Sequence, residues 1–144
     1  GVDEVVLNPN SFSHIILVLK QLILNFGENM SLRTNLTHIE SLEDHKSVVE
    51  NNENVMVCCG RMGPMCIPVY DVMEELESEY TNIKFADMPF DSSDAKVIRD
   101  LEECRNFAGL PFTVYYKNGK VVKATSSIQS RDQITSILDE QFGK

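Results

Sequence analysis

The pattern of apolar positions divides the chain into two parts near residue 35. Before it, Val5–Leu7 is a short apolar run typical of a strand, and residues 11–26 carry apolar side chains at helical spacing on one broad face. A polar stretch over 28–35 then predicts a loop or linker. We therefore interpret residues 1–35 as an N-terminal extension, a strand plus an apolar helix. It is either an added helix that covers the main domain or the end of a preceding domain.

From Leu36 to the end of the chain, short apolar runs alternate regularly with segments of helical periodicity. Alternating strands and helices predict a parallel core, and a late hairpin adds antiparallel strands at one side. The sequence thus predicts an α/β domain over 36–144, with a mixed central sheet and helices on both faces. The predicted strands cover residues 37–40, 55–59, 83–88, 112–116 and 121–124, and the predicted helices cover 41–51, the segment that follows the 60–65 turn as far as Tyr80, 92–107 and 131–142.

Three local signals strengthen this outline. Val55–Cys59 is a continuous apolar run of the kind found in central strands. Lys117-Asn118-Gly119 is a tight hairpin turn between two strand-like segments. Ser130 and Gln133 have the spacing of a capping box, which predicts the start of the last helix.

The charge and cysteine content narrow the classes of function. A formal net charge of -9 argues against nucleic acid and anionic membrane surfaces as main partners. The longest uninterrupted apolar run, Ile15–Leu19, is too short to span a bilayer. Three of the four cysteines, Cys58, Cys59 and Cys66, are clustered and Cys104 stands apart, which is unlike a secreted disulfide framework. We therefore expect a cytoplasmic protein with no membrane or nucleic-acid partner.

Several segments, taken in order, resemble one known family. Met62-Gly63-Pro64-Met65 follows the central apolar strand, the segment from Asp71 to Tyr80 follows that loop, and Gly109-Leu110-Pro111-Phe112-Thr113 leads into the strand that ends at the hairpin turn. These segments resemble the thioredoxin family, which has Cys-Gly-Pro-Cys and Gly-Ile-Pro-Thr at the two loops. The resemblance covers Leu36 to Lys144. It implies a thioredoxin fold and a cis Leu110–Pro111 bond that faces the active site.

The active-site loop departs from the family pattern. Counting from the strand places Met62 and Met65 in the two cysteine positions, whereas counting back from Tyr80 places Gly63 and Cys66 there. Neither register leaves a Cys-x-x-Cys pair. The chain has no tryptophan, and Met56 stands where the resemblance implies a buried strand aspartate. Dithiol exchange by the ordinary family mechanism is therefore not expected.

Cys66 is the residue most suited to chemistry. It falls in the first turn of the predicted helix, where unpaired N–H groups and the helix dipole favour a thiolate, although it could equally pack as a small apolar residue. Cys59 ends the strand and could approach Cys66 across the turn. Cys58 must face the opposite side of the sheet from Cys59 and reads as core. Because no Cys-x2-Cys knuckle is present, a metal or iron–sulfur site built from Cys59, Cys66 and Cys104 is disfavoured, and we expect no metal and no cofactor.

Two functions remain open. In the first, an atypical thiol redox protein, Cys66 is the nucleophile and Cys59 or Cys104 resolves the intermediate. In the second, the domain is a redox-inactive binding module or an accessory domain of a larger redox enzyme. The resemblance favours the first slightly. In both, a protein or peptide partner would contact the loop and the proline edge, which comprise Met62, Gly63, Pro64, Met65, Cys66 and Pro111. The three histidines precede this loop in sequence and are expected at the surface.

Overall fold

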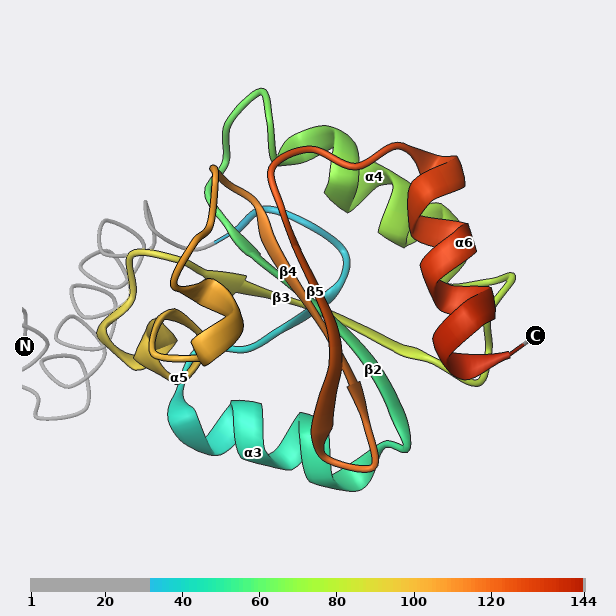
Figure 1. Cartoon of the computed structure of the whole chain (residues 1–144), viewed down its shortest axis with the longest axis horizontal. Helices are drawn as coiled ribbons and strands as arrows, with labels where there is room; N and C mark the ends of the chain where they lie inside the picture. The colour runs from blue at the N-terminus through green and yellow to red at the C-terminus, as the bar shows by residue number, and fades with distance from the viewer. Residues whose placement is uncertain (1–31, 144) are drawn as a thin grey trace, which may run out of the picture.

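The computed structural model describes residues 32–143, so the predicted strand and helix of the N-terminal extension lie outside the described residues. The core is a five-stranded sheet in the order β1-β3-β2-β4-β5 (Figure 1). The strands β1, β3 and β2 are mutually parallel, and β4 is antiparallel to both β2 and β5. The predicted mixed sheet is therefore confirmed. The strands are β1 (Thr37–His38), β2 (Asn54–Gly60), β3 (Lys84–Pro89), β4 (Phe112–Lys117) and β5 (Lys120–Ser126).

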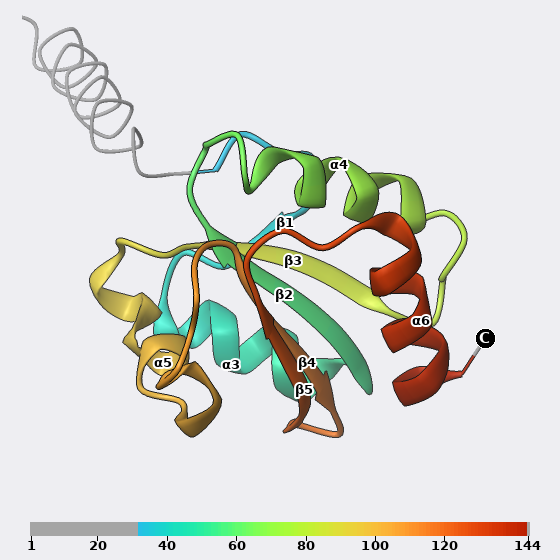
Figure 2. The same ribbon diagram turned by 45° about the horizontal axis from the view of Figure 1, so that its top comes forward.

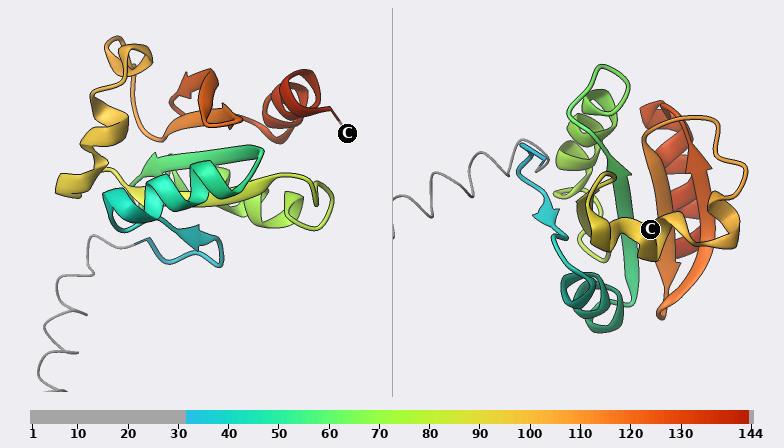
Figure 3. Two further views of the ribbon diagram at one scale, coloured as in Figure 1. Left: turned by 90° about the horizontal axis from the view of Figure 1, so that it is seen from below. Right: turned by 90° about the vertical axis from the view of Figure 1, so that its left-hand side faces the viewer.

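Helices cover both faces of the sheet, as predicted. The helices α4 (Ile67–Leu76) and α6 (Arg131–Phe142) pack on one face, which we call the loop face (Figure 2). The opposite face is covered by α3 (Leu42–Asn51) and α5 (Lys96–Arg99), and Figure 3 shows the sheet between the two layers. Within residues 32–143, no helix combines the length and the apolar character that crossing a membrane requires.

The strand β2 forms the centre of the domain, and all seven of its residues are buried. Because side chains alternate along a strand, Met56 and Cys58 belong to the cluster under α4 and α6. Val57 and Cys59 belong to the cluster under α3 and α5. Each fully buried apolar side chain of this size contributes roughly 1.5–3 kcal/mol. This single strand therefore ties the two layers of helices to one sheet.

The local signals in the sequence identify the ends of several elements. Ser130 and Gln133 form the predicted capping box, in which the Gln133 N–H donates to Ser130 Oγ over 3.2 Å and the Ser130 N–H donates to Gln133 Oε1 over 2.8 Å. The turn between β4 and β5 has positive φ at Asn118 (53°) and Gly119 (80°), as a tight hairpin turn requires. The helix α4 ends at Leu76 and continues as a turn, shorter than the predicted extent to Tyr80.

The single helix predicted over 92–107 is wrong. The segment begins as η2 (Ser93–Ala95), which runs directly into α5, and it ends as η3 (Glu102–Cys104). Leu101 separates α5 from η3, because its backbone is extended (φ -62°, ψ 143°). Arg99 Nη1 donates to the carbonyl oxygens of Phe90 and Ser92 over 2.6 and 2.7 Å, which folds the segment back on its own start. The spacing of apolar residues does not report whether the backbone between them stays helical.

Candidate functional site

Two loops meet at one end of the sheet. Residues 61–66, which we call the motif loop, connect β2 to α4, and Leu110–Pro111 immediately precedes β4. Because β2 pairs antiparallel with β4, with Cys59 opposite Phe112, the end of one strand lies beside the start of the other. The Leu110–Pro111 peptide bond is cis, as the sequence around it predicts. The structure therefore brings together the two segments on which the resemblance rests.

The Cys66 thiol lies under the motif loop. The residue is only 3% exposed, and the Arg61 backbone N–H donates to its Sγ over 3.5 Å. Gly60 shows how closely the surrounding groups pack. A Cβ added to it would lie 2.7 Å from Tyr70 Oη, 2.8 Å from Cys66 Sγ and 3.2 Å from Pro111 Cβ. The end of β2 must be glycine because a thiol, a phenol and the cis proline converge on that point.

The start of α4 is more fully hydrogen-bonded than the sequence suggests. The N–H groups of Cys66 and Ile67 both donate to the carbonyl of Gly63, over 3.1 and 3.0 Å, and the Val69 N–H donates to Cys66 O over 3.0 Å. Pro68 has no N–H. The donor that reaches the sulfur is therefore the Arg61 backbone, not a free N–H of the helix. The positive end of the α4 dipole still points at Cys66.

Two contacts fix the first residue of the motif loop. Tyr70 Oη donates to the carbonyl oxygen of Arg61 over 3.1 Å, and burial raises the pKa of this phenol. The Arg61 guanidinium donates to both carboxylate oxygens of Asp91, over 2.6 and 2.7 Å. This charged hydrogen bond lowers the pKa of Asp91. The loop is thus held to α4 on one side and to the segment after β3 on the other.

The middle of the motif loop presents apolar surface. Met62 is 39% exposed and Met65 is 46% exposed, and a Cβ added to Gly63 would meet nothing within 4 Å. Six large apolar side chains are exposed in the part of the chain that the structure describes. Five of them lie in segments that follow or precede strands at this one end of the sheet. They are Met62, Met65, Ile67, Phe107 and Ile128.

All four cysteines are buried free thiols, and they fall on two faces of the sheet. Cys66 and Cys58 share the loop face, whereas Cys59 lies on the opposite face in the same cluster as Cys104. The structure therefore does not bring Cys59 to Cys66, and the alternative three-cysteine metal site is not assembled either. Sequence reasoning identified the alternation of Cys58 and Cys59, but the expected approach of Cys59 to Cys66 is not found, because Cys59 lies in the cluster of the opposite face.

Burial controls the ionisation of the strand thiols. It raises the pKa of Cys58 well above its usual range, although Thr113 Oγ1 donates to Cys58 Sγ over 3.9 Å and opposes that shift. On the other face, burial and the nearby Cys104 raise the pKa of Cys59 to about 12. Burial also raises the pKa of Cys104. These three thiols are therefore protonated at neutral pH.

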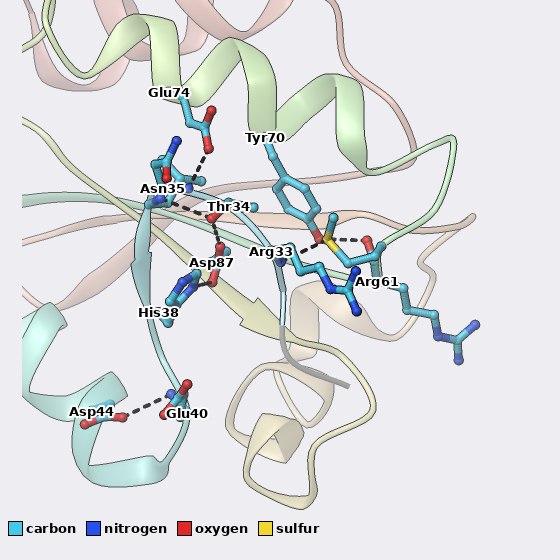
Figure 4. Close-up of polar contacts among 12 residues, drawn as sticks. Arg33, Thr34, Asn35, His38, Glu40, Asp44, Arg61, Tyr70, Glu74 and Asp87 are labelled. Atoms are coloured by element: carbon cyan, nitrogen blue, oxygen red, sulfur yellow. Dashed lines mark hydrogen bonds and ion pairs between the residues drawn. The ribbon is translucent and has the colours of Figure 1, made fainter. Parts of the chain in front are cut away.

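A buried carboxylate lies on the loop face next to the Cys58 thiol. Asp87 is the fully buried fourth residue of β3, and it accepts hydrogen bonds from Thr34 Oγ1 and, over 2.7 Å, from His38 Nδ1 (Figure 4). Burial raises the pKa of Asp87, while its bonds to Thr34 and His38 oppose the shift. Sequence reasoning missed this site. The available signal was an acidic residue inside a predicted buried strand.

The residues just before β1 also contact the site. The Arg33 N–H donates to Met62 Sδ over 3.2 Å, and the Asn35 N–H donates to Glu74 Oε1 over 2.6 Å (Figure 4). Leu32 and Leu36 are buried in the cluster of the loop face. Residues 32–35, which the sequence places in the extension, therefore pack onto α4 and the motif loop.

Comparison with known proteins supports the fold. No protein-family model matches the chain, and no curated protein is significantly similar to it in sequence. Among solved structures, the chain is similar to Chlamydomonas reinhardtii thioredoxin f2, with a TM-score of 0.64, 15% identity and coverage of 76% of this chain and 99% of that one. It is also similar to Plasmodium falciparum thioredoxin (TM-score 0.61, 22% identity, 74% and 99% covered). A third is mitochondrial thioredoxin 3 of Saccharomyces cerevisiae (TM-score 0.60, 16% identity, 73% and 94% covered). The chain has the thioredoxin fold.

Proposed function

We propose that this domain carries out thiol–disulfide exchange through Cys66, acting on glutathione disulfide or on disulfides of proteins. The observation that supports this most directly is the position of Cys66 Sγ, at the N-terminal end of α4, in contact with the Arg61 N–H and beside the cis proline. A backbone donor and a helix dipole both stabilise negative charge on sulfur. No other cysteine of the chain combines these features.

The proposed reaction is an exchange of one disulfide for another. The Cys66 thiolate attacks one sulfur of the incoming disulfide, a mixed disulfide forms, and the second sulfur leaves as a thiolate that takes up a proton. Because Cys66 is buried, the incoming disulfide must enter between the motif loop and Pro111. Met62 and Met65 suit this position, since unbranched thioether side chains adapt their shape readily.

Glutathione disulfide tests this proposal directly. The reduced full chain is incubated with it at pH 7, the reaction is quenched with acid, and the products are followed by intact mass and by peptide mapping. The first product should carry one glutathione, on Cys66. Cys66→Ser should abolish it, whereas Cys104→Ser should retain it, because Cys104 is similarly buried but lies on the other face. No adduct, or an adduct on another cysteine, would refute the proposal.

Protein binding without turnover is the second candidate. It is favoured by the five exposed apolar side chains around the motif loop. If it holds, extended peptides selected from a displayed random library should bind the wild type and Cys66→Ser equally. They should lose binding to a Met62→Glu, Met65→Glu double variant. Failure to enrich any peptide that discriminates the double variant would rule this candidate out.

A further inference from the structure

Polar and ionisable side chains form one row across the whole sheet. The strand register places His38 of β1 opposite Asp87 of β3, Asp87 opposite Cys58 of β2, Cys58 opposite Thr113 of β4, and Thr113 opposite Thr125 of β5. Two of these four neighbouring pairs are joined by side-chain hydrogen bonds, His38 to Asp87 and Thr113 to Cys58. The row thus connects the buried thiol of Cys58, through Asp87, to an imidazole that is 37% exposed.

This row passes beneath Cys66. Cys58 and Gly60 lie on the same face of β2, about 7 Å apart along the strand, and the Cys66 sulfur occupies the space next to Gly60. Since Gly60 has no Cβ, no strand side chain stands between the two sulfurs. Burial is the main cause of the raised pKa of the Cys58 thiol, and the nearby Cys66 adds to it in the same direction. Cys58 is therefore the one cysteine that shares the buried cluster of the loop face with Cys66.

We propose that Cys58 is the resolving thiol of the site and that Asp87 accepts its proton. This inference rests on the proposed exchange at Cys66, because it concerns the fate of the mixed disulfide. The Cys58 thiol gives its proton to the Asp87 carboxylate and attacks the Cys66 sulfur. The bond between Cys66 and glutathione breaks, the Cys58–Cys66 bond forms, and glutathione leaves as a thiolate that takes up a proton. Overall the two protein thiols lose two electrons and glutathione disulfide gains them.

The environment of each group suits this assignment. A thiol held protonated by burial needs a nearby base before it can act as a nucleophile, and a buried carboxylate with a raised pKa is a better proton acceptor than an ordinary one. His38 holds that carboxylate in place. Besides Asp87, Cys58 and His38, the ionisable groups around the row come from four elements or loops. They are Glu40 after β1, Cys59 on β2, Cys66 and Tyr70 at α4, and Tyr115 on β4.

The test follows the second step of the same reaction in the full chain. After the glutathione adduct forms, peptide mapping without reduction should show it converting to a species with Cys58 linked to Cys66 and free glutathione released. Cys58→Ala should stop the reaction at the adduct. Cys59→Ser should leave both steps unchanged, because Cys59 is the neighbouring cysteine on the opposite face. The wild-type map does not depend on whether any variant folds.

Asp87→Asn tests the proton acceptor. It should slow the conversion of the glutathione adduct to the Cys58–Cys66 disulfide at pH 7 by about 100-fold. It should also remove the acceleration of this conversion that the wild type shows as Asp87 ionises. Formation of the adduct on Cys66 should be retained. Circular dichroism verifies that the variant is folded, so a purely structural effect is separable. An unchanged conversion rate would overturn the role of Asp87.

The failures of the two proposals are distinguishable. If the adduct forms on Cys66 and persists without a Cys58–Cys66 bond, the resolving role of Cys58 is overturned and the exchange at Cys66 stands. If a Cys59–Cys104 disulfide forms instead of a Cys58–Cys66 disulfide, the resolving role of Cys58 is likewise overturned. If no adduct forms and no disulfide appears, both proposals fail.

Discussion

The two faces of the sheet each bury a pair of cysteines, and the pairs have different surroundings. On the face under α3 and α5, Cys59 and Cys104 lie among apolar side chains, and within residues 32–143 their thiolates are favoured by the positive charge of Arg99 alone. On the loop face, Cys58 lies between Asp87 and Thr113 and beneath Cys66. Cys58 and Cys59 are thus adjacent in one strand and carry the same thiol group, but the groups that surround the two thiols differ.

The comparison shows that burial alone does not select a reactive thiol. Burial raises the pKa of both Cys58 and Cys59. Cys58 differs from Cys59 in having a proton acceptor, Asp87, beside it and a second sulfur, that of Cys66, at the motif loop on the same face. Only the loop face has both, so the comparison predicts that any thiol chemistry is confined to it.

The largest expected effect is the inertness of Cys59. With a pKa of about 12, only about 10⁻⁵ of this thiol is ionised at pH 7. Alkylation by iodoacetamide at pH 7 should therefore be at least about 1,000-fold slower at Cys59 in the folded chain than in urea, where the thiol has its ordinary pKa. Peptide mapping over a time course measures both rates. Similar rates in the two conditions would show that burial does not keep Cys59 inert in the folded chain.

Gly60 tests how tightly the loop face is packed. Gly60→Ala should lower the free energy of unfolding by about 1–3 kcal/mol, because its Cβ would overlap Tyr70 Oη and Cys66 Sγ. Gly63→Ala is the matched control in the same loop. Its Cβ meets nothing within 4 Å, so the change should stay within about 0.5 kcal/mol. Urea denaturation of both variants measures the difference, and equal stability would show that the loop yields without cost.

Much of the fold could be predicted because its signals are local. The apolar run of β2, the capping box at Ser130 and the Asn118-Gly119 turn each determine a backbone conformation within a few residues. The break at Leu101 could not be predicted in this way. Its extended backbone accompanies long-range contacts, such as the bonds of Arg99 to Phe90 and Ser92, which the spacing of apolar residues does not encode.

The site was only partly predictable for a related reason. The motif loop and Pro111 carry their own sequence pattern, so their meeting was expected. The choice between Cys58 and Cys59 depends on which face of β2 turns toward α4, and alternation alone leaves that open. The His38–Asp87 pair joins residues 49 positions apart on neighbouring parallel strands. Nothing in either segment alone indicates the pairing.

Asp87 is expected to lower the stability of the fold, although it serves the proposed proton transfer. Its pKa is raised in the folded protein, so its ionised form costs folding free energy, and the wild type loses stability as the pH rises from the ordinary Asp value of the unfolded state to that raised value. Asp87→Asn should therefore unfold at a higher urea concentration than the wild type at pH 7. The difference should vanish below about pH 4, where the carboxyl is protonated in both states. A destabilised variant at pH 7 would instead show that the bonds from Thr34 and His38 outweigh the cost of burial.

The smallest effect is expected from the charges on the outside of the loop face. Arg131 of α6 donates to Glu75 near the end of α4 and to Glu79 just beyond it, and the three side chains are 42–65% exposed. Exposed ion pairs contribute little because water and salt screen them, so Arg131→Ala should lower Tm by at most a few degrees. About 1 M NaCl should remove even that difference, since the screening length then falls to about 3 Å. Arg131→Lys retains the positive charge but not the two-pronged guanidinium, so its Tm should lie between those of the wild type and Arg131→Ala. A loss of stability in Arg131→Ala that persists in high salt would mean that the arginine stem packs across the two helices. Side-chain packing at the surface, and not only the buried cluster beneath, would then hold α4 and α6 together over the site.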